Sequence, residues 1–217
     1  MKIKHSINLH KGLTALFIVG LMLAYGNFGI EAWVYLALHG TYGLIWLLKD
    51  RIYPDRQWEQ ELSLGMGVVT FGLLGLYWVA PWLLISQGTM VPLPVIAAAI
   101  ALNITGVFLH YSSDAQKYFT LKYRPGLITD GFFRRCRNTN YLGEMLIYGS
   151  FALLSWHWIP WLIFAAFVGL VFVPNMRKKD QSLSRYPEFA QYKAQSGLCW
   201  PSLVRSAARA VDPAEQP

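Results

Sequence analysis

The chain has 217 residues, of which 54% are hydrophobic and 15% aromatic, and its formal net charge is +7. A transmembrane β-barrel is excluded, because its strands would alternate polar and apolar residues in segments of about 10, and no such pattern is present. The positive charge does not indicate a nucleic-acid partner, since it lies in the gaps between long apolar runs, as in polytopic membrane proteins.

Six apolar runs contain neither lysine nor arginine. In chain order they are Gly12–Phe28, Ile30–Leu48, Leu64–Ile85, Val91–Leu109, Tyr141–Ser155 and Trp158–Val173. About 20 apolar residues are enough to cross the hydrocarbon core of a bilayer, and the fifth run is short by that measure. The sequence therefore predicts an all-α fold, a polytopic membrane bundle of about six spans.

The lysines and arginines lie in alternate gaps of this pattern. They precede the first run and follow the second, fourth and sixth runs, whereas the gaps near Gly29, Gln87 and His157 carry no positive charge. Basic loops stay in the cytosol and set the orientation of membrane helices. We therefore expect both termini and both long loops to face the cytoplasm.

The second run and the lysine that follows it carry a stripe of side chains at a spacing of three or four residues, namely Glu31, Tyr35, His39, Tyr42, Trp46 and Lys49. A helix brings side chains with this spacing onto one face. Ionisable residues within a span usually face the bundle interior or a wet cavity, and they indicate function. This favours a catalytic role for Tyr42, His39 and Glu31. The alternative is a hydrogen bond that holds two helices together.

A second polar stripe leads from the fourth run into the gap that follows it. Its members are Asn103, His110, Asp114 and Lys117, spaced by seven, four and three residues. The alternative interpretation is that Asp114 and Lys117 form only a surface ion pair between residues three apart on a helix. Because the stripe leads into an arginine-rich segment, a functional interpretation is favoured.

The segment Tyr111–Asn140 is strongly basic, with six positive and two negative side chains and a net charge of +4. The basic residues are Lys117, Lys122, Arg124, Arg134, Arg135 and Arg137, and the acidic residues are Asp114 and Asp130. The turn dipeptides Pro125-Gly126 and Asp130-Gly131 divide the segment. A long loop in a compact domain is either functional or disordered, and the aromatic residues here favour an ordered cytosolic loop that binds a cofactor.

Arginines, amides and a carboxylate gather at the mouth of the fifth run, where Arg134, Arg135 and Arg137 are followed by Asn140, Tyr141 and Glu144. Guanidinium groups bind phosphate through paired hydrogen bonds. A carboxylate buried without a partner would be costly, so Glu144 requires either a ligand or a structural partner. A cofactor site and an Arg–Glu pair both meet this requirement.

Beyond the sixth run, Pro187-Glu188 suits the first turn of a short amphipathic C-terminal helix that carries Phe189 and Tyr192 on one face. The composition of residues 204–217 is typical of a frayed tail. The two cysteines of the chain have no metal-ligand spacing, so no metal site is predicted.

Several of these motifs resemble the C-terminal domain of steroid 5α-reductases and related bacterial membrane proteins. They are Asp114-Ala-Gln-Lys117, Arg124-Pro-Gly-Leu-Ile-Thr-Asp-Gly131, Arg137-Asn-Thr-Asn-Tyr-Leu-Gly-Glu144 and Ser184-Arg-Tyr-Pro-Glu-Phe-Ala-Gln-Tyr192. The resemblance covers about residues 103–203. More distantly, the domain is similar to isoprenylcysteine carboxyl methyltransferases and sterol C14-reductases. Their usual Arg-His-Pro-Asn-Tyr reads Arg-Asn-Thr-Asn-Tyr in this chain, a departure that weakens the methyltransferase interpretation more than the reductase one.

The resemblance implies a membrane-bound reductase in a bacterial inner membrane. It would use NADPH to reduce a carbon–carbon double bond conjugated to a ketone in a steroid-like or isoprenoid lipid. Residues 1–110 would form the substrate cavity and residues 111–203 the cofactor domain. The cofactor residues would be Asp114, Lys117, Lys122, Arg124, Arg134, Arg135, Arg137, Asn140, Tyr141 and Glu144. The proton donor would be Tyr42, tuned by His39 or Glu31.

Two other functions stay open at this point. One is a methyltransferase that uses S-adenosylmethionine, although that cofactor carries a sulfonium cation and no phosphate and so has less use for an arginine cluster. The other is a non-catalytic lipid-binding or assembly protein of the membrane. The oligomeric state is open as well.

Overall fold

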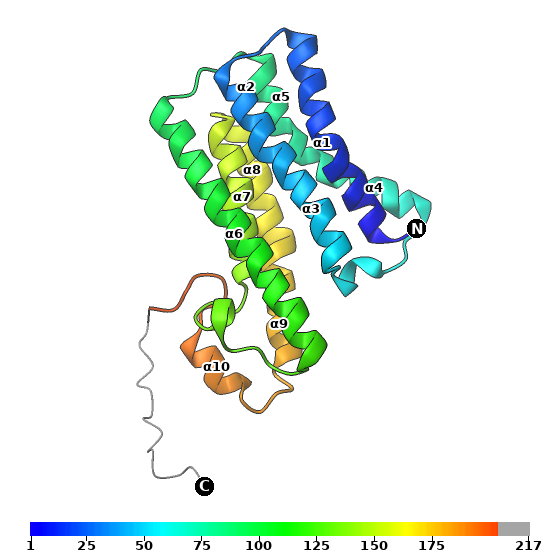
Figure 1. The fold of residues 1–217 in the computed structure, drawn as a ribbon, viewed down its shortest axis with the longest axis vertical. Helices are drawn as coiled ribbons and strands as arrows, with labels where there is room; N and C mark the ends of the chain where they lie inside the picture. Colours follow the sequence, from blue (N-terminus) through cyan, green and yellow to red (C-terminus); the bar gives the residue numbers. More distant parts are fainter. Residues whose placement is uncertain (204–217) are drawn as a thin grey trace.

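The computed structural model describes residues 1–203, which fold into a bundle of long helices lying side by side (Figure 1). Within these residues there is no strand, only isolated β-bridges that join Lys2 to Glu61 and Cys136 to Gly197. The all-α prediction is therefore confirmed for the described part of the chain. The tail expected at residues 204–217 lies outside it.

The α-helices are α1 (Ile3–Tyr25), α2 (Ile30–Tyr35), α3 (Thr41–Ile52), α4 (Leu64–Gly75), α5 (Val79–Ser86), α6 (Leu93–Tyr123), α7 (Thr139–Leu154), α8 (Trp158–Phe167), α9 (Val173–Leu183) and α10 (Phe189–Gln195). Single turns of π-helix connect α2 to α3 (η1, Leu36–Gly40) and α8 to α9 (η5, Val168–Phe172). Short 3-10 helices are η2 (Arg56–Glu59), η3 (Leu76–Trp78) and η4 (Gly131–Phe133).

Four helical stretches are long and apolar enough to cross a membrane, namely Ile3–Tyr25, Leu64–Ser86, Leu93–Tyr123 and Trp158–Leu183. These identify an integral membrane protein. The other two apolar runs are also helical, as the continuous stretch 30–52 and as α7, and they lie within the same bundle (Figure 1).

Helix α6 extends well beyond the apolar run that begins it. The loop predicted from Tyr111 starts only after Tyr123, because no proline or glycine interrupts the helix between Gly106 and Pro125. The polar stripe of α6 therefore lies on a rigid helix. The expected boundary after residue 110 falls inside α6, so both halves of the chain share this helix.

Two glycines bring α6 and α7 unusually close. A Cβ atom on Gly143 would lie 2.4 Å from the backbone nitrogen of His110, and one on Gly106 would lie 2.6 Å from the carbonyl oxygen of Gly143. Small residues permit such close packing between membrane helices. As a result, the Nδ1 atom of His110 lies 3.0 Å from the carbonyl oxygen of Asn140 at the start of α7.

Replacing Gly143 by alanine is expected to push α6 and α7 apart, because the new methyl group would overlap the backbone of α6. Overpacking costs about 1–3 kcal/mol, which lowers the unfolding midpoint of a chain of this size by about 5 °C. Thermal unfolding of the protein in detergent measures this change. The matched control is Gly149→Ala on the same helix, where the added Cβ would meet only Phe164 at 3.9 Å. Equal midpoints for the two variants would contradict the prediction.

Candidate functional site

Two neighbouring cavities lie at the end of the bundle where α3, α6 and α9 carry their basic residues. The outer cavity is open and has a volume of about 800 Å³, and the inner cavity has a volume of about 130 Å³. Asp55 and Asp114 line both cavities and so mark the place where they adjoin.

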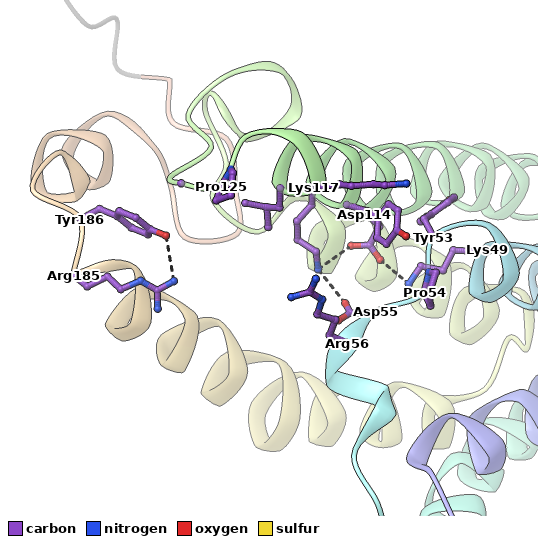
Figure 2. Close-up of a pocket in the computed structure, with 14 residues that line it drawn as sticks. Lys49, Tyr53, Pro54, Asp55, Arg56, Asp114, Lys117, Pro125, Arg185 and Tyr186 are labelled. Carbon is purple, nitrogen blue, oxygen red and sulfur yellow. Dashed lines mark hydrogen bonds and ion pairs between the residues drawn. The ribbon is translucent and has the colours of Figure 1, made fainter.

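The outer cavity has an excess of positive charge. Its basic residues are Lys49, Arg56, Lys117, Lys122 and Arg185, and its acidic residues are Asp55 and Asp114. The net charge of this lining is +3. The connection between α9 and α10, with Arg185, faces α3 and α6 across the cavity (Figure 2). Three converging elements therefore present cations to one space, an arrangement that favours an anionic ligand with several charges.

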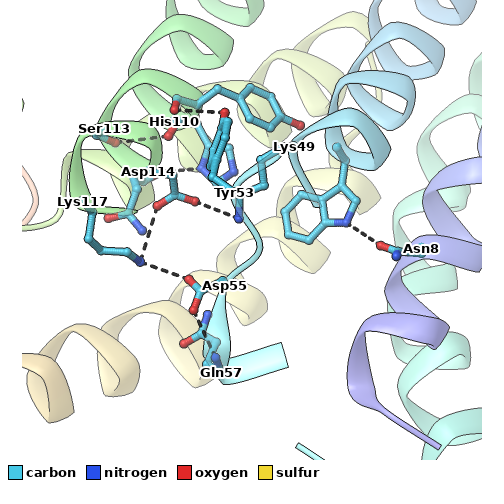
Figure 3. Close-up of polar contacts among 12 residues, drawn as sticks. Asn8, Lys49, Tyr53, Asp55, Gln57, His110, Ser113, Asp114 and Lys117 are labelled. Carbon is cyan, nitrogen blue, oxygen red and sulfur yellow. Dashed lines mark hydrogen bonds and ion pairs between the residues drawn. The ribbon is translucent and has the colours of Figure 1, made fainter. Parts of the chain in front are cut away.

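A chain of ion pairs holds the wall between the two cavities. Asp114 lies 3.3 Å from the Nζ atom of Lys49 and 3.7 Å from that of Lys117, and Lys117 reaches Asp55 at 3.0 Å (Figure 3). Asp114 and Lys49 are only 5% and 4% exposed. Because each charge has an opposite neighbour, the network joins α3, α6 and the segment before η2 into one unit.

Tyr53 follows α3 and lines the outer cavity beside this network. Its hydroxyl group donates a hydrogen bond to the carbonyl oxygen of Tyr111 at 3.3 Å. Burial, together with the nearby carboxylate of Asp114, raises the pKa of Tyr53 to about 12. The phenol is therefore neutral at physiological pH and acts as a hydrogen-bond donor.

The segment of residues 53–63, which we call the strap, crosses from α3 to α4 and contributes Asp55, Gln57 and Trp58 to the inner cavity. The N-terminus of the chain anchors it, because the Nζ atom of Lys2 lies 2.7 Å from a carboxylate oxygen of Glu59. The terminal amino group also donates to the carbonyl oxygen of Leu62 at 2.8 Å.

Polar groups from three helices meet in the inner cavity. Lys11 of α1, His110 of α6 and Glu144 of α7 all line it. The Nζ atom of Lys11 donates a hydrogen bond of 2.7 Å to the hydroxyl oxygen of Tyr148, which lies one turn beyond Glu144. The rest of the lining is mainly aromatic or aliphatic, with Ile7, Trp46, Trp58, Leu74, Tyr77, Tyr141, Phe167, Val171 and Phe172.

The carboxylate of Glu144 is half-buried and forms no hydrogen bond or ion pair with any residue among 1–203. The Arg–Glu pair considered above is therefore wrong for the described chain, since Arg137 pairs with Asp180 instead. A partly buried carboxylate at the wall of a cavity can accept hydrogen bonds from a ligand.

The structure brings together six of the ten predicted cofactor residues. Asp114, Lys117 and Lys122 line the outer cavity, and Asp114, Asn140, Tyr141 and Glu144 line the inner one. Their helices position them, because the four-residue steps from His110 to Asp114 and from Asn140 to Glu144 each follow one helical face.

The four arginines of the prediction lie outside both cavities. Arg134 and Arg135 are exposed, and Arg124 is an exposed partner of Asp130 at 4.0 Å. Arg137 is buried, and its guanidinium group binds both carboxylate oxygens of Asp180 at 3.0 Å. It also donates to carbonyl oxygens of the α10 segment, at Lys193 and Ser196. The structure therefore does not bring Arg137 to either cavity, and its donors are used to attach α10 to α9.

The three residues predicted to be catalytic also lie outside both cavities. His39 and Tyr42 are completely buried, because their helix face packs against α7, where the ring of His39 stacks on that of Phe151 at 4.0 Å. Glu31 accepts a hydrogen bond from the backbone of Val91. It lies about 27 Å along the helix from Lys49 and so at the other end of the bundle from the outer cavity. The prediction that this stripe faces the substrate is therefore not supported.

Several residues of the site were missed in the sequence, among them Tyr53, Arg56 and Arg185 of the outer cavity. Asp55 lies in a short charged gap between two apolar runs. From the sequence alone, Lys11 cannot be distinguished from the other lysines that set membrane orientation. Tyr148 could have been found, because Asn140, Glu144 and Tyr148 are spaced by four residues and so share one face of α7.

Comparison with known proteins gives one family. Residues 51–196, about two-thirds of the chain, match the model of a protein of unknown function, DUF1295. The chain belongs to the DUF1295 family. The DUF1295 region contains Asp55, Asp114, Glu144 and Tyr148, whereas Lys11 and Lys49 precede it. In the same comparisons, no curated protein and no solved structure matches the chain.

Replacing Asp114 by asparagine is expected to destabilise the protein, because it leaves the buried Lys49 without an opposite charge. Breaking a buried ion pair on one side costs about 3–5 kcal/mol, or roughly 10 °C in the unfolding midpoint for a chain of this size. Thermal unfolding in detergent measures the loss. Asp130→Asn is the control, because its pair with Arg124 is exposed and contributes about 1 kcal/mol or less. A smaller effect at Asp114 than at Asp130 would show that the network is not structural.

Proposed function

We propose that this chain is a membrane-embedded, NADPH-dependent reductase. Its substrate class is a steroid-like or isoprenoid lipid with a carbon–carbon double bond conjugated to a ketone. The observation that carries the proposal is the junction of two cavities of different chemistry at Asp55 and Asp114. A basic cavity suited to a polyanionic cofactor adjoins a smaller, partly aromatic cavity, in which the carboxylate of Glu144 has no hydrogen-bond or ion-pair partner among residues 1–203.

NADPH fits the chemistry of the outer cavity. The net charge of +3 complements a pyrophosphate and a 2′-phosphate, and the volume of about 800 Å³ is within the range of about 300–1,000 Å³ common for ligand sites. Arg56, Lys122 and Arg185 would bind phosphate, because they lie on the exposed side of the cavity. S-adenosylmethionine has no phosphate and would leave these cations unused.

Polar residues of the inner cavity would hold the nicotinamide end of the cofactor. Glu144 can accept a hydrogen bond from a carboxamide, and Asn140 can donate or accept one. When it is bound, NADPH supplies a hydride. The aromatic lining of the inner cavity excludes water from the reacting atoms and provides an apolar surface for the lipid. The resemblance of the motifs from Asp114 to Glu144 to steroid 5α-reductases supports the same reaction.

NADPH is expected to bind the detergent-purified protein at micromolar concentrations, and added salt is expected to weaken binding by screening the phosphate contacts. Replacing Arg56 or Arg185 by alanine should weaken binding about tenfold, the effect of losing one charge-assisted hydrogen bond. Isothermal titration measures both effects. The control is Arg135→Ala, since Arg135 is exposed and outside both cavities. Binding of S-adenosylmethionine without binding of NADPH would favour the methyltransferase instead.

We further infer that all six helical segments cross the membrane and that the basic end, with both cavities, faces the cytosol. The turns that join α1 to α2, α5 to α6 and α7 to α8 lie at the other end of the bundle (Figure 1). By the helix bounds, these turns contain Gly29, Gln87 and His157. Reporter fusions after Gln87 should therefore report a periplasmic location, and fusions after Asp130 a cytoplasmic one. The opposite pattern would place the outer cavity on the periplasmic side, where it could not bind cytosolic NADPH, and would contradict the proposal.

A further inference from the structure

We propose that Tyr148 is the proton donor of this site and that Lys11 positions its hydroxyl group. The inference rests on the proposed reductase function and adds the group that acts on the substrate carbonyl. The proposed donor lies on α7 and its positioning residue on α1, whereas the sequence had predicted Tyr42 on α3 as the donor.

Tyr148 has the geometry that a donor requires. It lines the inner cavity, four residues after Glu144 on the same face of α7, and is only 4% exposed. Its hydroxyl oxygen accepts the hydrogen bond from Lys11 at 2.7 Å. A phenol that accepts from a neighbouring donor keeps its own proton for a different acceptor. A substrate carbonyl in the inner cavity would be such an acceptor.

Lys11 is held for this contact by its surroundings. It is 3% exposed and forms no direct salt bridge with a carboxylate within residues 1–203, although the charge of Glu144 in the same cavity acts on it. Its Nζ atom instead lies 4.1 Å from the ring centre of Tyr42 and 5.1 Å from that of Tyr148, in contacts of the cation–π type. The backbone is fixed too, because α3 packs against it at Gly43, where a Cβ atom would lie 2.4 Å from the carbonyl oxygen of Lys11.

A lysine buried without an ion pair is costly and indicates a function when it lies inside a membrane protein. A purely structural role would be met by any side chain that fills the space between the rings of Tyr42, Trp46 and Tyr148. The hydrogen bond to Tyr148 instead uses the one property that an apolar residue lacks, a proton to donate.

Other tyrosines near the cavity fit the role less well. The ring of Tyr77 lies flat on that of Tyr148, with 3.8 Å between their centres, and no lysine donates to its hydroxyl group within residues 1–203. Tyr42 is completely buried and does not line the inner cavity, and its ring meets that of Tyr148 edge-on with 5.9 Å between their centres.

The proton transfer balances with residues of this chain. The O–H bond of Tyr148 breaks and its proton goes to the carbonyl oxygen of the substrate. The phenolate takes a proton from the ammonium group of Lys11, which recovers one from water. One hydride and this proton complete the two-electron reduction to an enol, which rearranges to the saturated ketone. A positioned acid of this kind accelerates the reaction about 10²–10⁴-fold.

The size of the inner cavity suggests the probe for a test. A cavity of about 150 Å³ holds one benzene-sized ring, and the inner cavity has a volume of about 130 Å³. The probe is therefore 2-cyclohexen-1-one labelled with ¹³C at the carbonyl carbon, bound to the full chain in detergent without NADPH. Infrared difference spectra report the carbonyl stretching frequency, which falls when the oxygen accepts a hydrogen bond.

In the wild type, the bound carbonyl is expected to absorb at a lower frequency than the probe in detergent alone. Tyr148→Phe should abolish this shift and weaken probe binding about tenfold, since it removes one hydrogen bond and keeps the ring. Lys11→Met should reduce the shift by releasing the hydroxyl group, and it serves as the second variant if Tyr148→Phe does not fold. Tyr35→Phe is the matched control, because Tyr35 is equally buried but lies outside the cavity.

A wild-type spectrum without a shift would overturn the proposal, as would a shift that survives in Tyr148→Phe. A shift that is lost in Tyr42→Phe and kept in Tyr148→Phe would return the role to Tyr42.

NADPH titration of the same variants separates this inference from the proposed function. If the wild type binds the probe with the expected shift but does not bind NADPH, the reductase proposal fails and the hydrogen-bond assignment stands. With a reducible substrate, Tyr148→Phe should lower turnover at least a hundredfold and leave NADPH affinity unchanged.

Discussion

The close approach of α6 and α7 at Gly106 and Gly143 is the constraint on which the whole site depends. No side chain separates the two backbones there, so the polar faces of both helices open onto the same space. Membrane helices gain little from burying apolar surface against each other, because lipid is equally apolar, and tight packing has to hold them instead. The ionic network on α6 and the carboxylate of Glu144 on α7 are therefore close together because both helices have a glycine, without a Cβ atom, at their point of contact.

Buried charge explains why the two adjoining cavities differ. On the outer side, Lys49 and Lys117 are neutralised by Asp114 and Asp55, so the positive excess lies on the exposed cations of the rim. On the inner side, the ammonium group of Lys11 lies among aromatic rings and donates to a phenol. An anion is thus favoured at the rim, and a neutral group with a hydrogen-bond acceptor is favoured inside.

Much of the fold and part of the site could be predicted from the sequence, because helical periodicity is local. The apolar runs gave the helices, and the spacing of Asp114 and Lys117 gave one wall of the outer cavity. The predicted residues that lie outside both cavities are placed by contacts that are distant in the chain. In the sequence, Arg137 looks like a phosphate ligand whether or not Asp180, 43 residues later, occupies its guanidinium group. Likewise, a polar stripe shows that a helix face is buried but not which helix covers it, and the stripe of Tyr42 turned out to face α7.

Lys11 shows how one residue can satisfy two physical demands at once. As a basic residue before the first long apolar run, it contributes to the charge asymmetry that orients a membrane protein. Because α1 begins at Ile3, the same residue lies on the helix itself, facing α3 and α7. It also precedes the region matched to DUF1295, which contains Tyr148 and Glu144. The proposed proton-donating pair therefore joins a residue of the N-terminal helix to one of the DUF1295 region, so under this proposal the chemistry would depend on how α1 packs as well as on that region.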